Sequence, residues 1–151
     1  MSKSPPPPVP RFTVVTLGVA DMRASIAFYE ALGFARKFRA TGEAVAFFDT
    51  GATVIGLFPW HELAQDAALP DAPRPMAFRG ITLAWNCRTP EEVDAVMEFA
   101  LSKGAKLVRP AEKTDYGGYR GYFADPDGHP WEVVVAPHIE VGEDRRVHLP
   151  D

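Results

Sequence analysis

The sequence predicts an α+β fold of two similar halves, each with the order strand, helix and three further strands. Two pairs of matching segments indicate the repeat. The stretch Val14-Val-Thr-Leu17 is echoed by Gly80-Ile-Thr-Leu83, and a helical pattern follows each of them. Phe48 and Phe123 each lie near the end of a strand pattern, just before a turn that contains Asp and Gly. The chain is therefore expected to contain one βαβββ unit followed by a second.

In the first half, residues 12–19 are rich in β-branched side chains and are expected to form a strand. Asp21 is a suitable N-cap for the helix that follows, and Gly33 is a suitable stop. Between them, apolar residues recur at helical spacing: Met22, Ile26, Tyr29 and Leu32. Short strands are predicted next, at residues 35–39, 44–49 and 52–58, with Asp49-Thr-Gly51 as the hairpin turn between the last two.

In the second half, residues 78–86 are an apolar run of strand length. Thr89-Pro-Glu-Glu92 combines an N-cap, a proline at the first helical position and a glutamate three residues after the cap. The predicted helix has one apolar stripe and ends near Gly104. Three strand candidates follow, at residues 106–108, 119–124 and 131–136, and the turn Asp125-Pro-Asp-Gly128 joins the last two.

These elements indicate a single domain over residues 12–137, built from modules at residues 12–58 and 78–136. Residues 59–77 contain several prolines and are interpreted as a linker, with a helical turn expected at residues 62–67. Residues 1–11 are proline-rich and are expected to form an extended, disordered tail, because proline cannot donate to a strand ladder. The polar residues 138–151 are interpreted as a second tail.

The composition indicates which partners the protein can bind and in which compartment it is expected. Of 151 residues, 46% are hydrophobic and 24% are charged, as in ordinary globular domains. A formal net charge of −4 without a run of Lys or Arg argues against nucleic-acid binding. No apolar segment approaches the roughly 20 residues that span a bilayer, and no signal-peptide pattern is present. A cytoplasmic protein without a membrane partner is therefore expected. Its single cysteine, Cys87, excludes an internal disulfide and is expected to be buried.

The second half contains a motif that resembles the vicinal-oxygen-chelate superfamily: Gly117-Gly-Tyr-Arg-Gly-Tyr-Phe-Ala-Asp-Pro-Asp-Gly-His-Pro-Trp-Glu132. Segments of the first half resemble the opening of that family's first module: Val19-Ala-Asp21, Ser25-Ile-Ala-Phe-Tyr29 and Leu32-Gly-Phe34. The superfamily includes glyoxalase I, extradiol dioxygenases, fosfomycin-resistance enzymes and bleomycin-binding proteins. The resemblance covers about residues 12–137. It implies paired βαβββ modules whose sheets curl around a cleft, and a homodimer, but it does not specify a reaction.

The resemblance also implies where a metal would bind. Metal-dependent members have one ligand in the first strand and one in the last strand of each module. These positions correspond here to Val14, Gly56, Gly80 and Glu132, of which only Glu132 has a side chain that can bind a metal. Catalytic metal sites usually have three protein ligands, so a protein without a cofactor is expected, and a divalent metal is the less favoured alternative.

Glu132 is the candidate catalytic residue. Alternation along residues 131–136 places it on the face opposite to Trp131, within an otherwise apolar strand. A carboxylate in that position must be paired, hydrogen-bonded or protonated. One interpretation is a salt bridge to Arg120 or Arg39. The favoured alternative is a group that hydrogen-bonds a ligand or acts as an acid or base.

Other candidate ligand-binding residues lie in two places. Tyr116, Tyr119 and Arg120 flank two glycines, which give a flexible approach, and their rings and guanidinium can grip a planar or anionic molecule. The alternative for this stretch is a hairpin loop with surface tyrosines. Trp60 and His61 follow the strand whose inner face lines the first half of the cavity. Surface positions are the favoured interpretation for all the histidines, and His61 is the exception that has a potential role at the cavity.

Three functions remain open, because one fold supports many chemistries. The first is metal-free binding of a small, partly apolar molecule, as in the bleomycin-binding proteins. The second is a glyoxalase-like lyase or related enzyme that uses Glu132 as an acid or base or as a metal ligand. The third is a regulatory or structural module with a filled cavity. A small-molecule partner is expected in the first two.

Overall fold

The structure, a computed structural model, describes residues 8–70 and 78–151 and contains two four-stranded mixed sheets. The first module comprises β1 (Val14–Val19), α1 (Met22–Ala31), β2 (Ala35–Lys37), the 3-10 helix η1 (Arg39–Thr41), β3 (Ala46–Asp49) and β4 (Val54–Pro59). The helix α2 (Trp60–Asp66) follows it. The second module comprises β5 (Leu83–Asn86), α3 (Pro90–Ser102), β6 (Lys106–Lys113), β7 (Tyr119–Ala124) and β8 (Pro130–Val135), and the strands β9 (Glu140–Val141) and β10 (Val147–His148) come last.

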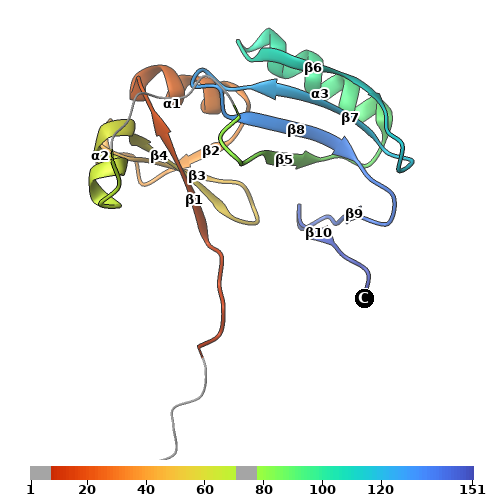
Figure 1. Ribbon diagram of the computed structural model, residues 1–151, viewed down its shortest axis with the longest axis horizontal. Helices are drawn as coiled ribbons and strands as arrows, with labels where there is room; N and C mark the ends of the chain where they lie inside the picture. The colour runs from red at the N-terminus through yellow and green to blue at the C-terminus, as the bar shows by residue number, and fades with distance from the viewer. Residues whose placement is uncertain (1–7, 71–77) are drawn as a thin grey trace, which may run out of the picture.

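The two sheets have the same topology (Figure 1), with the strand orders β1-β4-β3-β2 and β5-β8-β7-β6. In each module the first strand pairs in parallel with the last, and the other neighbours are antiparallel. A parallel pair needs a long connection between its strands, and a helix with a hairpin provides it in each module. The predicted repeat of two βαβββ modules is confirmed.

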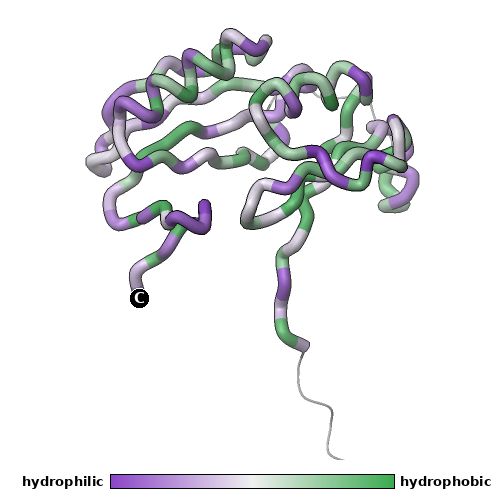
Figure 2. Tube along the Cα trace, turned by 180° about the vertical axis from the view of Figure 1, so that it is seen from behind, coloured by the Kyte–Doolittle hydropathy of each residue, from purple (hydrophilic) through white to green (hydrophobic). Residues whose placement is uncertain are grey.

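One face of each sheet is covered by the helix of its module. The other, here called the open face, is not covered by these helices, although α2 packs on part of that of the first sheet, where Trp60 and Leu63 lie against Gly18. α1 packs on the first sheet and α3 on the second, and the buried strand residues beneath them occupy alternate positions: Leu17, Val19, Phe48, Ile55, Leu57, Phe123, Trp131 and Val133. Cys87 is also buried in this core, as predicted. In Figure 2 apolar residues concentrate along the strands, whereas α3 alternates between apolar and polar residues. The intervening strand positions, which include Val14 and Glu132, belong to the open faces.

Both module helices begin at side-chain caps. Asp21 Oδ1 accepts from the backbone N–H of Ala24 (3.0 Å), and Thr89 Oγ1 accepts from that of Glu92 (3.1 Å). Glu92 in turn accepts from the backbone N–H of Arg88 at 2.6 Å, one residue before the cap. The predicted capping box is therefore present in a slightly shifted form. Among the residues described, no helix is long and apolar enough to cross a membrane.

Several segments differ from the sequence expectations. β6 runs to Lys113 rather than ending at residue 108, and β2 ends at Lys37 rather than at residue 39. β5 begins only at Leu83 rather than at residue 78, because Gly80 has a φ of 84°, which a strand does not adopt. The helical turn expected at residues 62–67 is the helix α2, which begins two residues earlier. In the predicted C-terminal tail, β9 and β10 form a hairpin, held by Arg88, which donates to the carbonyl oxygens of Val141 and Gly142. Residues 1–7 of the proline-rich tail and 71–77 of the linker lie outside the described residues.

A buried polar cluster joins the modules. The Tyr29 hydroxyl in α1 donates to Asp125 at 2.7 Å and accepts from Trp131 Nε1 at 3.2 Å. His129 Nδ1 lies 2.8 Å from the same Asp125 carboxylate, and His129 is only 6% exposed. Asp127 accepts from the Ala20 backbone N–H (2.8 Å). The expectation of a surface position for His129 is wrong, because the turn folds back onto the first module and buries its ring.

Candidate functional site

A cavity of about 520 Å³ lies on the open face of the second sheet. It is lined by Ala84 and Asn86 from β5, Glu132 and Val134 from β8, Tyr116 from the loop before β7, and the chain just after β8, namely Ala136, Pro137, His138 and Ile139. None of the described residues that line it belongs to the first module. Of the residues predicted from the sequence, Glu132 and Tyr116 therefore meet in one cavity.

Glu132 lies beside Tyr122, its direct partner across the antiparallel β7–β8 pair. Burial raises the pKa of the Tyr122 hydroxyl, and the negative charge of Glu132 and a hydrogen bond to it raise that pKa further. Tyr122 is thus a neutral proton donor at physiological pH. The arrangement places a carboxylate and a phenol side by side on a half-buried surface.

Neither arginine that was considered as a salt-bridge partner is paired with Glu132. Arg120 Nη1 lies 3.3 Å from Glu112, and Arg39 Nη2 lies 2.9 Å from Glu30. The structural interpretation of Glu132 as a member of either ion pair is therefore wrong. Its carboxylate is left to interact with Tyr122 and with whatever enters the cavity.

The stretch between β6 and β7 has a more structural character than its sequence suggests. The Tyr119 hydroxyl donates to Asp94 of α3 at 2.7 Å, so this ring points to the helix side of the sheet. Gly118 is buried, and a Cβ there would lie 2.8 Å from the carbonyl oxygen of Val135. Gly117 has a φ of 86°. The two glycines therefore permit a tight turn against β8, rather than a flexible approach, and Tyr116 is the exposed aromatic ring of the loop.

The candidate residues of the first module lie apart from Glu132. Val14 is 40% exposed on the open face of β1. A Cβ on Gly56 would lie 3.1 Å from Thr16 Oγ1, so this glycine permits close packing of side chains on the same face. Trp60 packs on Gly18, where a Cβ would lie 3.0 Å from its ring.

Two further candidate residues lie near the ends of the linker. His61 is exposed on α2. Gly80 stands at the other end of the linker, next to Arg79, whose guanidinium lies 5.2 Å from the centre of the Trp60 ring. A cation–π contact therefore brings the two ends of the linker together.

The family's metal positions do not form a metal site in this chain. Val14, Gly56 and Gly80 provide no side-chain donor atom, which leaves the single carboxylate of Glu132. In the part of the chain that the structure describes, no group of three or more His, Cys, Asp or Glu residues is arranged to hold an ion. The donor set therefore does not fit a divalent metal, which needs several ligands.

The sequence interpretation missed Asn86 and His138, which line the cavity, and Tyr122, which lies beside Glu132. Tyr122 and Asn86 could have been found from strand alternation, because both lie on the same face of the sheet as Glu132. The antiparallel register across the Asp125–Gly128 turn also makes Tyr122 the partner of Glu132. Counting outward from that turn would have identified the pair.

Comparisons with known proteins agree with this architecture. A profile of the Glyoxalase/Bleomycin resistance protein/Dioxygenase superfamily matches residues 11–133. A glyoxalase-related enzyme from Fulvimarina pelagi has a similar structure, with a TM-score of 0.82 and 35% identity over 95% of this chain and 100% of that one. A glyoxalase/bleomycin resistance protein/dioxygenase family enzyme from Burkholderia phytofirmans PsJN has a TM-score of 0.71 and 24% identity, covering 82% of this chain and 97% of the other. The second likeness concerns the fold alone.

A segment of a much larger protein is also similar. The leucine–tRNA ligase of Rhodococcus jostii (strain RHA1) is 30% identical over 116 residues, which are 70% of this chain. The chain spans only 12% of the length of that ligase. The match therefore concerns one segment of the ligase.

Proposed function

This chain belongs to the glyoxalase/bleomycin resistance protein/dioxygenase superfamily, and we propose that it binds a small, partly apolar molecule without a metal. The proposed site is the cavity on the open face of the second sheet. Its volume of about 520 Å³ lies within the range of small-molecule sites, roughly 300–1,000 Å³. The observation that carries the proposal is Glu132, which faces a largely apolar cavity beside Tyr122 instead of pairing with an arginine. The same open cavity argues against the third function, a module whose cavity is filled.

The pair of Glu132 and Tyr122 also favours a second candidate, an acid–base enzyme of the same superfamily. Such an enzyme needs two titratable groups within reach of one substrate. Glu132 can accept a proton, and Tyr122, whose pKa is raised, can donate a hydrogen bond or a proton to developing negative charge. Proton abstraction next to a carbonyl, as in lyases and isomerases, is the class of reaction that this pair can support.

The binding proposal is tested by thermal melting across a library of small carbonyl, aromatic and phosphonate compounds. A compound at about 100 times its dissociation constant should stabilise the parent protein by roughly 2.7 kcal/mol. Glu132→Gln keeps the shape of the side chain but removes its charge, so we expect normal folding and a clearly smaller ligand shift. Glu98→Gln, at an exposed position on α3, is the matched control. Equal ligand shifts in all three proteins would place the site elsewhere.

The enzyme candidate is tested with the same hits. Turnover of a hit is measured by NMR as the exchange of its protons with solvent. This exchange should disappear in Glu132→Gln and fall strongly in Tyr122→Phe. If the parent protein binds a hit without turning it over, the enzyme candidate is contradicted and small-molecule binding remains as the function.

We also propose that the chain acts as a homodimer, as the family resemblance implies. The support is the exposure of large apolar side chains on and near the first strand of each module: Phe12 (76%), Val14 (40%), Phe78 (72%) and Ile81 (43%). Light scattering should give a mass near twice 16.6 kDa. Val14→Lys should reduce this mass towards that of one chain, because it places a charge on the apolar face. A monomer at every protein concentration tested would overturn the proposal.

A further inference from the structure

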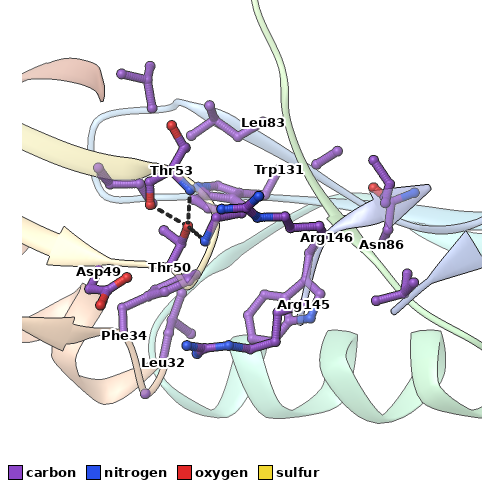
Figure 3. A pocket seen from close by; sticks show the side chains of 18 of the residues that line it. Leu32, Phe34, Asp49, Thr50, Thr53, Leu83, Asn86, Trp131, Arg145 and Arg146 are labelled. Atoms are coloured by element: carbon purple, nitrogen blue, oxygen red, sulfur yellow. Dashed lines mark hydrogen bonds between the residues drawn. The ribbon is translucent and has the colours of Figure 1, made fainter. Parts of the chain in front are cut away.

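A second and larger cavity lies at the junction of the two modules. Its volume is about 850 Å³, and it opens on the other side of β5 from Glu132, with Ala84 and Asn86 lining both cavities. Its floor is formed by Phe34, Leu83 and Trp131, and its walls by the β3–β4 turn and the β9–β10 hairpin (Figure 3). The cavity thus draws residues from both modules and from the C-terminal segment.

The floor of this junction cavity is aromatic. The ring of Phe34 lies 5.7 Å from the ring of Trp85 and 5.7 Å from that of Trp131, measured between centroids. The Trp131 Nε1 donor is already bonded to the Tyr29 hydroxyl. Trp131 is only 4% exposed, so the ring surface that the floor offers to a ligand is mainly that of the half-buried Phe34 and Trp85. Flat apolar rings of this kind favour a planar molecule that can stack.

The rim of the junction cavity is cationic. Arg145 and Arg146 extend from the β9–β10 hairpin across the cavity towards the β3–β4 turn (Figure 3). The Arg145 guanidinium occupies the space that a Cβ on Gly51 would need, with its atoms 2.4–2.5 Å from that position. Arg145 itself has a φ of 64°, a left-handed conformation that is uncommon outside glycine. In the described residues neither guanidinium lies within ion-pairing distance of a carboxylate.

The acidic residues near this rim are already engaged. Asp49 accepts from the backbone N–H of Gly51 at 2.7 Å, and Glu92 caps α3 through Arg88 at 2.6 Å. Asp144, in the same hairpin, has a pKa lowered by hydrogen bonds from the Arg146 backbone N–H and from His148, and also by the charge of Arg146. Two guanidinium groups that form no ion pair among the described residues, placed over an aromatic floor, are complementary to a molecule with a flat ring and a negative charge. Arginine binds carboxylates through two parallel hydrogen bonds, which fixes the orientation of such a ligand.

We propose that the junction cavity binds a planar aromatic carboxylate, with its ring on Phe34 and Trp85 and its carboxylate between Arg145 and Arg146. This site is separate from the one at Glu132 and does not depend on it. Naphthoate is a suitable probe, and naphthalenemethanol is its uncharged match in ring size. Calorimetry on the full chain should show naphthoate binding at least about tenfold more tightly than the alcohol, the change expected when a charge-assisted pair is lost.

Variants distinguish the two cavities. Arg145→Gln combined with Arg146→Gln should weaken naphthoate binding by about tenfold or more, whereas Arg109→Gln, at an exposed arginine on β6, should leave it unchanged. Glu132→Gln should also leave naphthoate binding unchanged, so failure of this proposal is distinct from failure of the proposed function. Equal affinity for acid and alcohol, unchanged binding in the double variant, or loss of binding in Glu132→Gln would each overturn the proposal.

A spectroscopic measurement on the unmodified chain keeps the test decisive if the double variant does not fold. Naphthoate should shift the indole N–H signals of Trp85 and Trp131 through ring currents and leave that of Trp60 in place. High salt should weaken these shifts, because it screens the carboxylate from the arginines. Shifts confined to Trp60, or insensitive to salt, would contradict the proposed site.

Discussion

The Asp125 carboxylate is fully buried and accepts hydrogen bonds from both modules. One of its oxygens receives the Tyr29 hydroxyl, and the other receives the backbone N–H groups of Asp127 and His129. Burial, followed by the charge of Asp125, raises the pKa of Tyr29 well above its ordinary value, so this hydroxyl remains a donor. Asp125, which the sequence assigns to a turn, therefore also joins the two modules through its hydrogen bonds.

We predict that Asp125→Asn lowers the free energy of unfolding by about 3 kcal/mol, because buried donors lose a charged acceptor. Tyr29→Phe should cost less, about 1.5–3 kcal/mol, since it removes one hydrogen bond to a charged group and leaves Trp131 Nε1 unpaired. Urea unfolding of both variants measures the two values. Ser25→Ala, which removes a hydroxyl bonded to Asp127 at 3.1 Å, is the control for a more peripheral bond of the same turn. A cost for Asp125→Asn no larger than that for Ser25→Ala would contradict the central role.

The stability supplied by Asp125 should depend on pH. Burial on its own raises the pKa of this carboxyl, but the hydrogen bond from His129, the His129 charge and the Tyr29 hydrogen bond outweigh it and lower the pKa. A carboxyl with a lowered pKa stabilises the fold fully above its unfolded pKa, about 3.9, and the effect is lost as the pH falls through the folded pKa. The stability difference between the parent and Asp125→Asn should therefore shrink in acid below about pH 4. Urea titrations between about pH 7 and about pH 3 measure it, and a difference that grows in acid would contradict this assignment.

At the scale of elements, the start of α3 shows what local sequence can specify. Thr89, Pro90 and Glu92 occupy cap, first and third helical positions, and the helix begins there as predicted. We predict that Thr89→Ala costs about 1 kcal/mol, because the Glu92 N–H loses its acceptor, whereas Thr89→Ser keeps the hydroxyl and costs only a few tenths. Thermal melting of the two variants provides the comparison. Equal losses in both would show that the methyl group, rather than the cap, carries the effect.

The elements also show which features local sequence patterns cannot predict. Strand alternation correctly assigned Trp131 to the covered face and Glu132 to the open face, because period-two alternation is a local property. The buried position of His129 could not be derived in this way, since it depends on Tyr29, which lies 96 residues before Asp125. The short β9–β10 hairpin was missed for a similar reason: part of its support comes from Arg88, 53 residues earlier than Val141.

The residues of the candidate site show the same difference between local patterns and distant partners. Glu132 was found because a carboxylate in an apolar strand is conspicuous. Tyr122 was missed although its pairing with Glu132 follows from the turn register. The roles considered for Tyr119 and Arg120 changed because their partners, Asp94 and Glu112, come from other elements. Spacing along the chain gives the direction of a side chain, but not which distant group it meets.

On the scale of the whole molecule, the two sheets share one core through Tyr29 and Trp131, whose ring centroids lie 6.1 Å apart. We predict that amides in β4 and β8 exchange with solvent at similar free energies of opening, because neither module can unfold without exposing this contact. In Asp125→Asn the free energies of opening measured for β4 and for β8 should differ from each other. Thr89→Ala, which weakens only the second module locally, is the control and should keep them together. Independent opening in the parent protein would contradict a shared core.

The long separation between Tyr29 and Asp125 has a consequence during protein synthesis. All strands of the first sheet lie within residues 14–59, so this module has its full set of pairings long before the chain is finished. Asp125 emerges 96 residues after Tyr29, a delay of about 5–20 s at ordinary ribosome speeds. During that interval α1 exposes an aromatic surface and a hydroxyl without its acceptor. A nascent chain in this window is therefore expected to be a client for chaperones until Asp125 has emerged and can accept from Tyr29.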